Sequence, residues 1–479
     1  MRVLSRAGAT VLVALLATGC AKFTGDGGMA PVSERVRREI GKDVVKIATP
    51  EEAQRARERV LSLLSEPLTE DTAVQVALLN NRGLQAEYND LGISEADYVQ
   101  ATLPANPAIG VARTFGTGNF VGIGFQLVGN LLAYATLPRR SEIARREFEE
   151  ARYRAIGATL GFTLDVRRAY VRAIAAQQRL SYLEQSRRTA DASARLIRQL
   201  GETGAANKLE QGRVAAFYAE LSVQVAQERM NVQREREALN RLLGLWGTDL
   251  NYVLPAKLTA LPTAPDPLGD VELEAIRRRI DLFVLRYEIV TLSKSIEFVD
   301  ATRYFSFLQL GGFYDNEVET KDSGEQTSKD RYGFTLGITI PIFDTGQARM
   351  GSARETYMRA VNRLTERSVN ARSEARVAYG SYRGYYDIAR FYQSRVLPLR
   401  QQISEEVLLR YNGMLLDLFE LLADAREGIA ANLAAFDSLR DYHLAMVDLQ
   451  AALIVGGTVP PAGIVNTIPP PQTIPIGIP

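Results

Sequence analysis

Cysteine and histidine are almost absent from this chain of 479 residues, which has one of each. A disulfide framework, a dithiol redox pair and a Cys–His metal cluster all need more of these residues, so the counts exclude them. A charge excess of one sign is also lacking, because 57 basic and 56 acidic residues give a formal net charge of +1. This balance excludes the strongly basic character of many nucleic-acid-binding proteins, and 46% hydrophobic residues exclude a disorder-type composition. No nucleophile–base constellation, phosphate-binding loop or metal-ligand spacing is present in the sequence, so we predict no enzyme, no cofactor and no metal site.

The single cysteine, Cys20, directly follows a typical export signal. A basic segment, an apolar segment over 7–17 and the small residues Ala17-Thr18-Gly19 precede it. This arrangement resembles the bacterial lipobox, in which the cysteine thiol takes a diacylglycerol and becomes the new amino terminus. We therefore predict a lipoprotein signal peptide over 1–19 and lipid anchoring through Cys20. Because Ala21 is not the Asp that marks retention in the inner membrane, the outer membrane is the expected destination. An ordinary signal peptide followed by an incidental Cys is the alternative.

Large apolar and small residues alternate from Arg331 to Phe343. One face would carry Tyr332, Phe334, Leu336, Ile338 and Ile340, and the other Gly333, Thr335, Gly337 and Thr339. The same alternation recurs where Val121, Ile123, Phe125 and Leu127 are interleaved with Gly122, Gly124 and Gln126. Both segments suit strands of a barrel with lipid outside and water inside. A half-buried strand of a soluble sheet is the alternative.

Proline is missing between Pro138 and Pro255, where the sequence is rich in Ala, Leu, Arg, Glu and Gln. The break at Leu200-Gly201-Glu202-Thr203-Gly204 predicts two helices of about 60 and 40 residues, or roughly 90 and 60 Å. A second helical run is predicted from Gly346 to Val455, with Pro398 as its only interior proline. Helices of this length need partners along their whole length.

The remaining segments give weaker signals. Residues 22–48 are predicted as an extended linker, followed by a short helix from Thr49 to about Ser65. One helix is predicted from Leu68 to about Leu103. In the second half, a strand near Tyr304 to Tyr314 is followed by a 16-residue loop, 315–330, whose six acidic residues must lie in water.

Two pairs of motifs indicate an internal duplication. Asp97-Tyr98-Val99-Gln100-Ala101-Thr102 is repeated as Glu297-Phe298-Val299-Asp300-Ala301-Thr302, and Arg198-Gln199-Leu200-Gly201 as Arg410-Tyr411-Asn412-Gly413. The offsets are 200 and 212, a difference that we assign to hairpin loops of 4 and 16 residues. The predicted organisation is therefore a lipid-anchored linker over 20–67, repeats over 68–255 and 267–455, and a Pro-rich tail over 456–479. Each repeat would read helix, strand, strand, helix, helix.

Further motifs give the chain a family resemblance. Leu68-Thr69 followed by Asn80-Asn81, the Leu242-Leu243-Gly244 helix end, Ile340-Pro341-Ile342-Phe343-Asp344-Thr345-Gly346 and the tip 410–413 resemble those of the TolC-like outer-membrane efflux proteins. The resemblance covers Leu68 to Val455, and the lipobox suits the lipoprotein branch of that family. The chain departs from the family pattern in its first half. Residues 129–134 precede Pro138 where the family often has a tight Pro-Leu-Phe turn, so the end of the second strand is undefined.

The resemblance implies a mixed α and β membrane protein. Four strands per chain cannot close a barrel alone, so several chains must share one. The family implies a homotrimer with a twelve-stranded transmembrane β-barrel in the outer membrane and long α-helices forming a periplasmic α-barrel. Its implied function is the exit duct of a tripartite efflux system, which passes small molecules or ions from a periplasmic adaptor and an inner-membrane pump. A duct for protein secretion, a periplasmic coiled-coil lipoprotein without a pore and an adhesin-like structural role are the alternatives.

The resemblance also implies site residues at the helix tips. Asp417, Glu420 and Asp424 share one helix face, and three chains would form acidic rings that favour cations at a periplasmic aperture. Solvated residues near a helix N-terminus are the alternative. Candidate adaptor-docking residues are Gly201, Gly204, Leu209, Gly413, Met414 and Leu415, although glycine is also the ordinary residue of helix-to-helix turns. His443 is predicted to be structural or surface-exposed. A membrane-interface girdle is predicted for Phe115, Phe120, Phe313, Tyr314 and Tyr332, with packing as the alternative.

Overall fold

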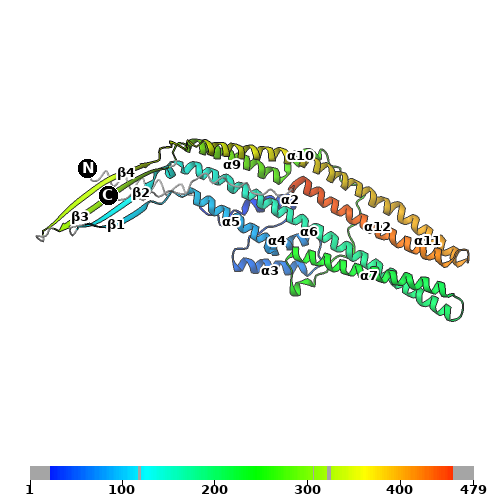
Figure 1. The fold of residues 1–479 in the computed structure, drawn as a ribbon. Coiled ribbons are helices and arrows are strands. Elements are labelled where there is room, and N and C mark those ends of the chain that lie inside the picture. Colours follow the sequence, from blue (N-terminus) through cyan, green and yellow to red (C-terminus); the bar gives the residue numbers. More distant parts are fainter. Residues whose placement is uncertain (1–21, 117–119, 306, 321–324, 457–479) are drawn as a thin grey trace.

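The computed structural model describes residues 22–116, 120–305, 307–320 and 325–456. The predicted signal peptide, Cys20 and the Pro-rich tail beyond Gly456 lie outside these residues. The molecule is elongated, with a β-sheet at one end and two helical hairpin tips at the other (Figure 1). A group of shorter helices lies along the middle of its length.

The sheet contains four antiparallel strands in the order β1-β2-β3-β4. They are β1 (Ala108–Gly116), β2 (Phe120–Asn130), β3 (Leu308–Thr320) and β4 (Gln326–Ile338). The alternation predicted for β2 and β4 is confirmed, because their large apolar side chains share one exposed face. Tyr332 and Phe334 on that face are 84% and 82% exposed. β1 and β4 are the outermost strands, so each has one unpaired edge.

The prediction of a loop over 315–330 is wrong. β3 and β4 continue through most of this segment in one register, which pairs Asp315 with Arg331 and Glu319 with Thr327. Polar side chains hold the two strands together here: Arg331 forms an ion pair with Glu317, and the Tyr314 hydroxyl donates to Asp330 at 2.9 Å. Most of the extra residues of the second repeat therefore lengthen its strands.

The first long hairpin consists of α6 (Leu131–Glu202) and α7 (Lys208–Leu243). At 72 residues, α6 is longer than predicted because it begins directly after β2 instead of near Pro138. Asn130 makes this possible, since its side chain accepts a hydrogen bond from the Ala133 N–H at 2.9 Å and caps the helix. α7 begins with a capping box between Asn207 and Glu210.

The single helix predicted from Leu68 to Leu103 is in fact two helices, α4 (Glu70–Asn80) and α5 (Arg82–Thr102). The break occurs because Asn81 caps α5, accepting from the Leu84 N–H at 3.0 Å. The side-chain amides of Asn80 and Asn81 also donate to four carbonyl groups at the end of α7, which are those of 241–244. The last carbonyls of a helix lack the N–H partners that a further turn would supply, so the two asparagines cap α7 from outside, and the Arg241 carbonyl also accepts from the Gly244 N–H.

A corresponding break separates α8 (Val271–Arg278) from α9 (Ile280–Thr302). Arg279 at this break is fully buried. Its guanidinium binds Asp281 through two hydrogen bonds of 3.1 and 2.8 Å and Glu374 through one of 2.6 Å. It also donates to the Ala452 carbonyl, at 3.3 Å, at the end of the second returning helix. Arg367 approaches Asp281 at 2.6 Å and completes the cluster.

The second long hairpin consists of α10 (Gln347–Phe391), η2 (Tyr392–Val396), α11 (Leu397–Asn412), α12 (Leu418–Gln450) and η3 (Ala451–Val455). The predicted helical run from 346 to 455 is therefore confirmed. η2 is a widened π turn just before Pro398. Proline lacks an N–H and its ring clashes with the carbonyl four residues earlier, which accounts for the irregular turn at this position.

The segment predicted as a linker contains a helix. α2 (Ala30–Ile40) packs its Val32 and Val36 side chains into the main core, so an extended linker over 22–48 is wrong. The predicted helix after Thr49 is confirmed as α3 (Pro50–Leu64), and η1 (Gly247–Leu250) follows α7. No helix within the described ranges combines the length and the apolar character that a membrane-crossing helix needs.

Four hydrophobic clusters hold the described helices together, and two of them position the hairpins. The largest one joins α2, α4, α5, α6 and the end of α7, and includes Leu78, Tyr88, Leu160 and Leu239. A second one lies toward the tips and packs Leu418 and Leu422 of α12 against α6 and α7. Together with α10, which contacts α12, these helices form a wall in the order α10-α12-α6-α7.

We expect Arg279→Met to lower the thermal unfolding midpoint strongly. Breaking a buried ion pair costs about 3–5 kcal/mol, because it leaves the partner buried with fewer compensating charges. Circular dichroism of the detergent-solubilised protein measures the midpoint. Arg376→Met is the matched control, since it removes the exposed Arg376–Glu272 pair and should cost at most about 1 kcal/mol. Equal shifts for the two variants would contradict an anchoring role for the buried cluster.

A second buried cluster is acidic. Burial raises the pKa of Glu147 to about 7, helped by the neighbouring charges of Glu150 and Asp97. Burial also raises the pKa of Glu150, although Arg154 opposes this, and that of Glu288, where Glu150 adds to the effect. Arg359 and Arg363 of α10 oppose the shift at Glu288.

The cluster predicts how stability depends on pH. Between about pH 4.5 and 7 the folded chain retains a proton on Glu147 that the unfolded chain has lost, so stability falls as pH rises through this window. We expect Glu147→Gln to raise the unfolding midpoint at pH 8 and to leave it unchanged at pH 4. Glu142→Gln, on the same helix, serves as the control. A gain that is the same at both pH values would contradict the proposed titration.

Candidate functional site

The two helix tips have the same hydrogen-bonded structure. In the first repeat, the Thr203 and Ala205 N–H groups donate to the Gln199 and Leu200 carbonyls. In the second, Gly413 and Leu415 donate to Leu409 and Arg410 in the same way. The tips therefore correspond at an offset of 210 residues rather than the predicted 212. Gly413 is the counterpart of Thr203, and Gly201 has a different place in its tip.

This correspondence pairs Gly204 with Met414. Both residues have left-handed backbone conformations, with φ of +78° and +56°. Glycine adopts this conformation freely, whereas a residue with a side chain pays roughly 1 kcal/mol for it. The side chain of Met414 is 93% exposed, so no packing within the chain offsets this cost. Leu415 and Leu209 are also exposed, so both tips present uncovered apolar side chains.

Gly201 and Gly413, the other two tip glycines named as docking candidates, have different structural surroundings. Gly201 lies under the Gln211 side chain of α7, where an added Cβ would be 2.0 Å from Nε2. Gln211 in turn donates to the Ala206 carbonyl at 3.1 Å, so Gly201 permits close packing inside the tip. Gly413 has φ of −78°, which any residue can adopt.

The three candidate aperture residues have different surroundings. Asp417 is exposed and caps α12, accepting from the Glu420 N–H at 3.0 Å. Glu420 is exposed in the first turn of the helix. Asp424 is half-buried and faces α11, where the Ser404 hydroxyl donates to it at 2.7 Å. Asp417 and Glu420 are thus available at the surface of the tip, while Asp424 also holds the hairpin together.

Ion pairs between distant segments support the tips and were not predicted from the sequence. Arg426 of α12 reaches Glu220 of α7 at 3.1 Å and joins the two hairpins. Arg400 of α11 pairs with Glu427 of α12. Arg426 and Glu220 are 206 positions apart in the sequence, and no spacing rule for a single helix could have found them.

The apolar face of the sheet is broad and uncovered. Ile109 and Val111 of β1 lie on it beside Phe125 and Leu127 of β2, and all four side chains are exposed. Of the five aromatic residues predicted as a girdle, Phe115, Tyr314 and Tyr332 lie on this face. The register places Phe120 and Phe313 on the opposite face, so their assignment to an outer girdle is wrong.

The lone histidine has a structural environment. His443 is buried, and its Nε2 lies 2.9 Å from the Thr259 carbonyl, which ties α12 to the segment between the repeats. Its ring also meets the Tyr442 ring edge-on. This environment fits the predicted structural role.

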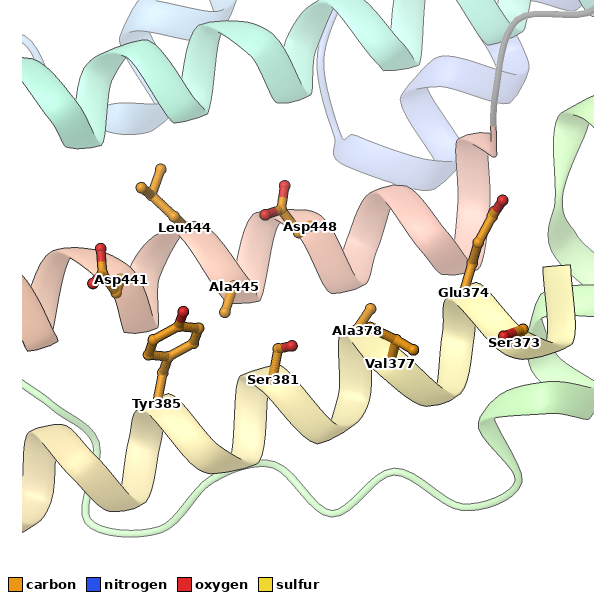
Figure 2. Close-up of a pocket in the computed structure, with 10 residues that line it drawn as sticks. All are labelled: Ser373, Glu374, Val377, Ala378, Ser381, Tyr385, Asp441, Leu444, Ala445 and Asp448. Carbon is orange, nitrogen blue, oxygen red and sulfur yellow. The ribbon is translucent and has the colours of Figure 1, made fainter. Parts of the chain in front are cut away.

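Figure 2 shows a groove of about 570 Å³ between α10 and α12. Three carboxylates line it, and each is paired: Glu374 with Arg279, Asp441 with Arg440, and Asp448 with Arg168. Within the described part of the chain, no group of three His, Cys, Asp or Glu residues is placed to hold a metal ion. The groove offers polar surface but no free charge cluster.

Comparison with known proteins supports an assignment of the fold. No protein-family model and no curated protein matches the chain. Among solved structures, it matches CusC, whose structures concern folding and transmembrane channel formation, with a TM-score of 0.66 and 19% identity over 84% of this chain and 92% of CusC. It matches the outer-membrane channel OprN with a TM-score of 0.65 and 18% identity over 92% and 97% of the two chains. It matches VceC, an outer-membrane protein of Vibrio cholerae, with a TM-score of 0.66 and 14% identity over 84% and 98%. The chain therefore has the fold of outer-membrane channel proteins, which is the fold that its resemblance to the TolC-like family implied.

Proposed function

We propose that this chain is one subunit of a homotrimeric exit duct in the outer membrane, part of a tripartite efflux system. The observation that carries the proposal is the four-stranded sheet at the end of the long helices. One face of this sheet is apolar and exposed, and its two edge strands are unpaired. Both features need partners that a single chain in water does not provide.

A shared barrel would satisfy both needs. Open strand edges in lipid leave backbone groups without hydrogen bonds at several kcal/mol each, so β4 of one subunit must pair with β1 of the next. Three chains then supply twelve strands, with the apolar face toward lipid and the glycine-rich face toward water. The aromatic residues Phe115, Tyr314 and Tyr332 would lie near one membrane interface.

The helices support the same assembly. α7 and α10 form the two ends of the helical wall within one chain, and both carry exposed aliphatic side chains. These are Val223 and Met230 on α7 and Val369 and Val377 on α10. In the proposed trimer, α10 of one subunit packs beside α7 of the next, which covers these side chains and closes an α-barrel in the periplasm.

The tips would form the periplasmic entrance. Asp417 and Glu420 of three subunits would line its aperture, with Asp424 behind them supporting the hairpin. Met414, Leu415, Leu209 and the neighbouring glycines Gly201, Gly204 and Gly413 would form the docking surface for a periplasmic adaptor, through which an inner-membrane pump delivers its substrate. Lipid attached to Cys20 would anchor each subunit in the outer membrane in addition to its barrel strands.

The native mass of the mature protein in detergent tests the assembly directly. We expect three chains per particle, after correction for bound detergent, and stepwise conductance when the particles are added to a planar bilayer. Two subunits joined by β4 of one and β1 of the other would keep one unpaired strand edge at each end. We therefore expect no stable dimers. A monomer that stays soluble without detergent once Cys20 is removed would refute the duct and favour a lipoprotein without a pore.

The aperture can be tested separately by removing charge alone. We expect the double variant Asp417→Asn, Glu420→Gln to lower the preference for cations over anions by about threefold or more, because rings of carboxylates favour cations. Asparagine still caps a helix, so α12 should stay folded. The reversal potential across a KCl gradient measures the preference. Glu58→Gln on α3 is the control, and an equal effect of the control would contradict the assignment of the aperture.

A further inference from the structure

A hollow of about 280 Å³ lies on the glycine-rich face of the sheet, opposite the apolar band. The strand register places eight of its ten lining residues on this face. Gly122 and Gly124 of β2 contribute no side chains to it. A Cβ at Gly122 would be 2.4 Å from the Thr114 hydroxyl, so the space depends on glycine at that position.

Asp315 of β3 lines this hollow and is only 9% exposed. Among the described residues, no side-chain hydrogen bond or ion pair reaches its carboxylate. The cross-strand neighbour Arg331 is directly opposite in the register, but its guanidinium pairs with Glu317. The carboxylate oxygens of Asp315 are not among the fully buried polar atoms that lack a partner, so they remain accessible to the water in the hollow. Asp315 therefore presents a carboxylate to the hollow that accepts from no other described side chain and can accept from a bound cation.

The surrounding charges define what would fit. The side chains on this face of β3 and β4 include the acidic Asp315, Glu317 and Glu319 and the basic Lys329 and Arg331. The group has one net negative charge per chain. This balance suits a singly charged cation better than a divalent metal ion, which prefers several free carboxylates. Arg331 is the one basic residue among those that line the hollow, and its ion pair with Glu317 makes it less available to an anion.

We propose that this hollow, the inner-face site, binds monovalent cationic groups such as a protonated amine as they pass along the lumen. The inference rests on the proposed duct, because only a closed barrel turns this face toward a lumen. Asp315 would accept hydrogen bonds from the bound cation, and Thr114 would add a hydroxyl. The site lies level with Tyr314 and Tyr332 of the opposite face, near the end of the apolar band and far from the helix tips.

The test uses the full-length trimer in planar bilayers. Asp315→Asn removes the charge with little change in shape and should reduce the cation-to-anion permeability ratio by about twofold. Asp315→Glu should retain the wild-type ratio. Asp330→Asn is the matched control, because Asp330 lies on the neighbouring strand but on the opposite face, where Tyr314 and Asn316 donate to it. It should leave the ratio unchanged.

Butylammonium chloride serves as the probe for binding. Added to both compartments, it should reduce the conductance of the wild-type channel, with half-block at about threefold higher concentration in Asp315→Asn, because a lost charge weakens attraction to the cation. An equal effect of the Asp315 and Asp330 variants, or none from either, would overturn the inner-face site while leaving the conducting duct intact. A trimer that does not conduct would refute the duct and, with it, the site.

Discussion

The ends of the two returning helices need hydrogen-bond donors from elsewhere in the chain, and the rest of the fold depends on how they obtain them. The last carbonyls of a helix have no partner in their own helix. In the first repeat, Asn80 and Asn81 supply amide donors to the end of α7. In the second, Arg279 supplies a guanidinium to the end of α12 and η3. Because α4–α5 and α8–α9 also lead to the strands, each contact fixes a long hairpin to the sheet end of the molecule.

The two repeats solve this problem with different chemistry. The asparagines are neutral and cost little to bury once they are hydrogen-bonded. Arg279 is a buried charge, so it needs Asp281, Glu374 and Arg367 around it, and these residues bring α10 into the same contact. Close packing at both ends requires glycine with positive φ. A Cβ at Gly244 would be 2.9 Å from the Asn80 carbonyl, and one at Gly456 would be 2.1 Å from Asp281. The second repeat is thereby tied to more elements than the first.

Patterns within one element were readable from the sequence, whereas contacts between elements were not. The alternation around Tyr332 predicted an apolar strand face, and the absence of proline predicted the long helices, because these are local properties of the chain. The break at Asn81 was missed although Asn80-Asn81 had been noted, because the amides act on carbonyls about 160 residues away. The helix α2 was missed for a similar reason: it is short, and packing of Val32 and Val36 into the core favours it more than its own sequence does. The predicted offset of 212 residues between the two tips rested on similar amino-acid sequences at 198–201 and 410–413. The backbone hydrogen bonds of the tips show that the offset is 210 residues.

The wrongly predicted loop over 315–330 shows why polar strands are hard to recognise. Six acidic residues in 16 suggest water, and an antiparallel strand with water on both faces has no apolar alternation to mark it. Cross-strand pairing replaces apolar packing here, since Arg331 binds Glu317 on one face and Asp330 accepts from Tyr314 and Asn316 on the other. In the proposed barrel this arrangement extends the wall beyond the apolar band without exposing backbone. It also places charged residues on the face that would line the lumen, so the part of the strands that lacks a lipid-facing pattern is the part able to interact with what passes through.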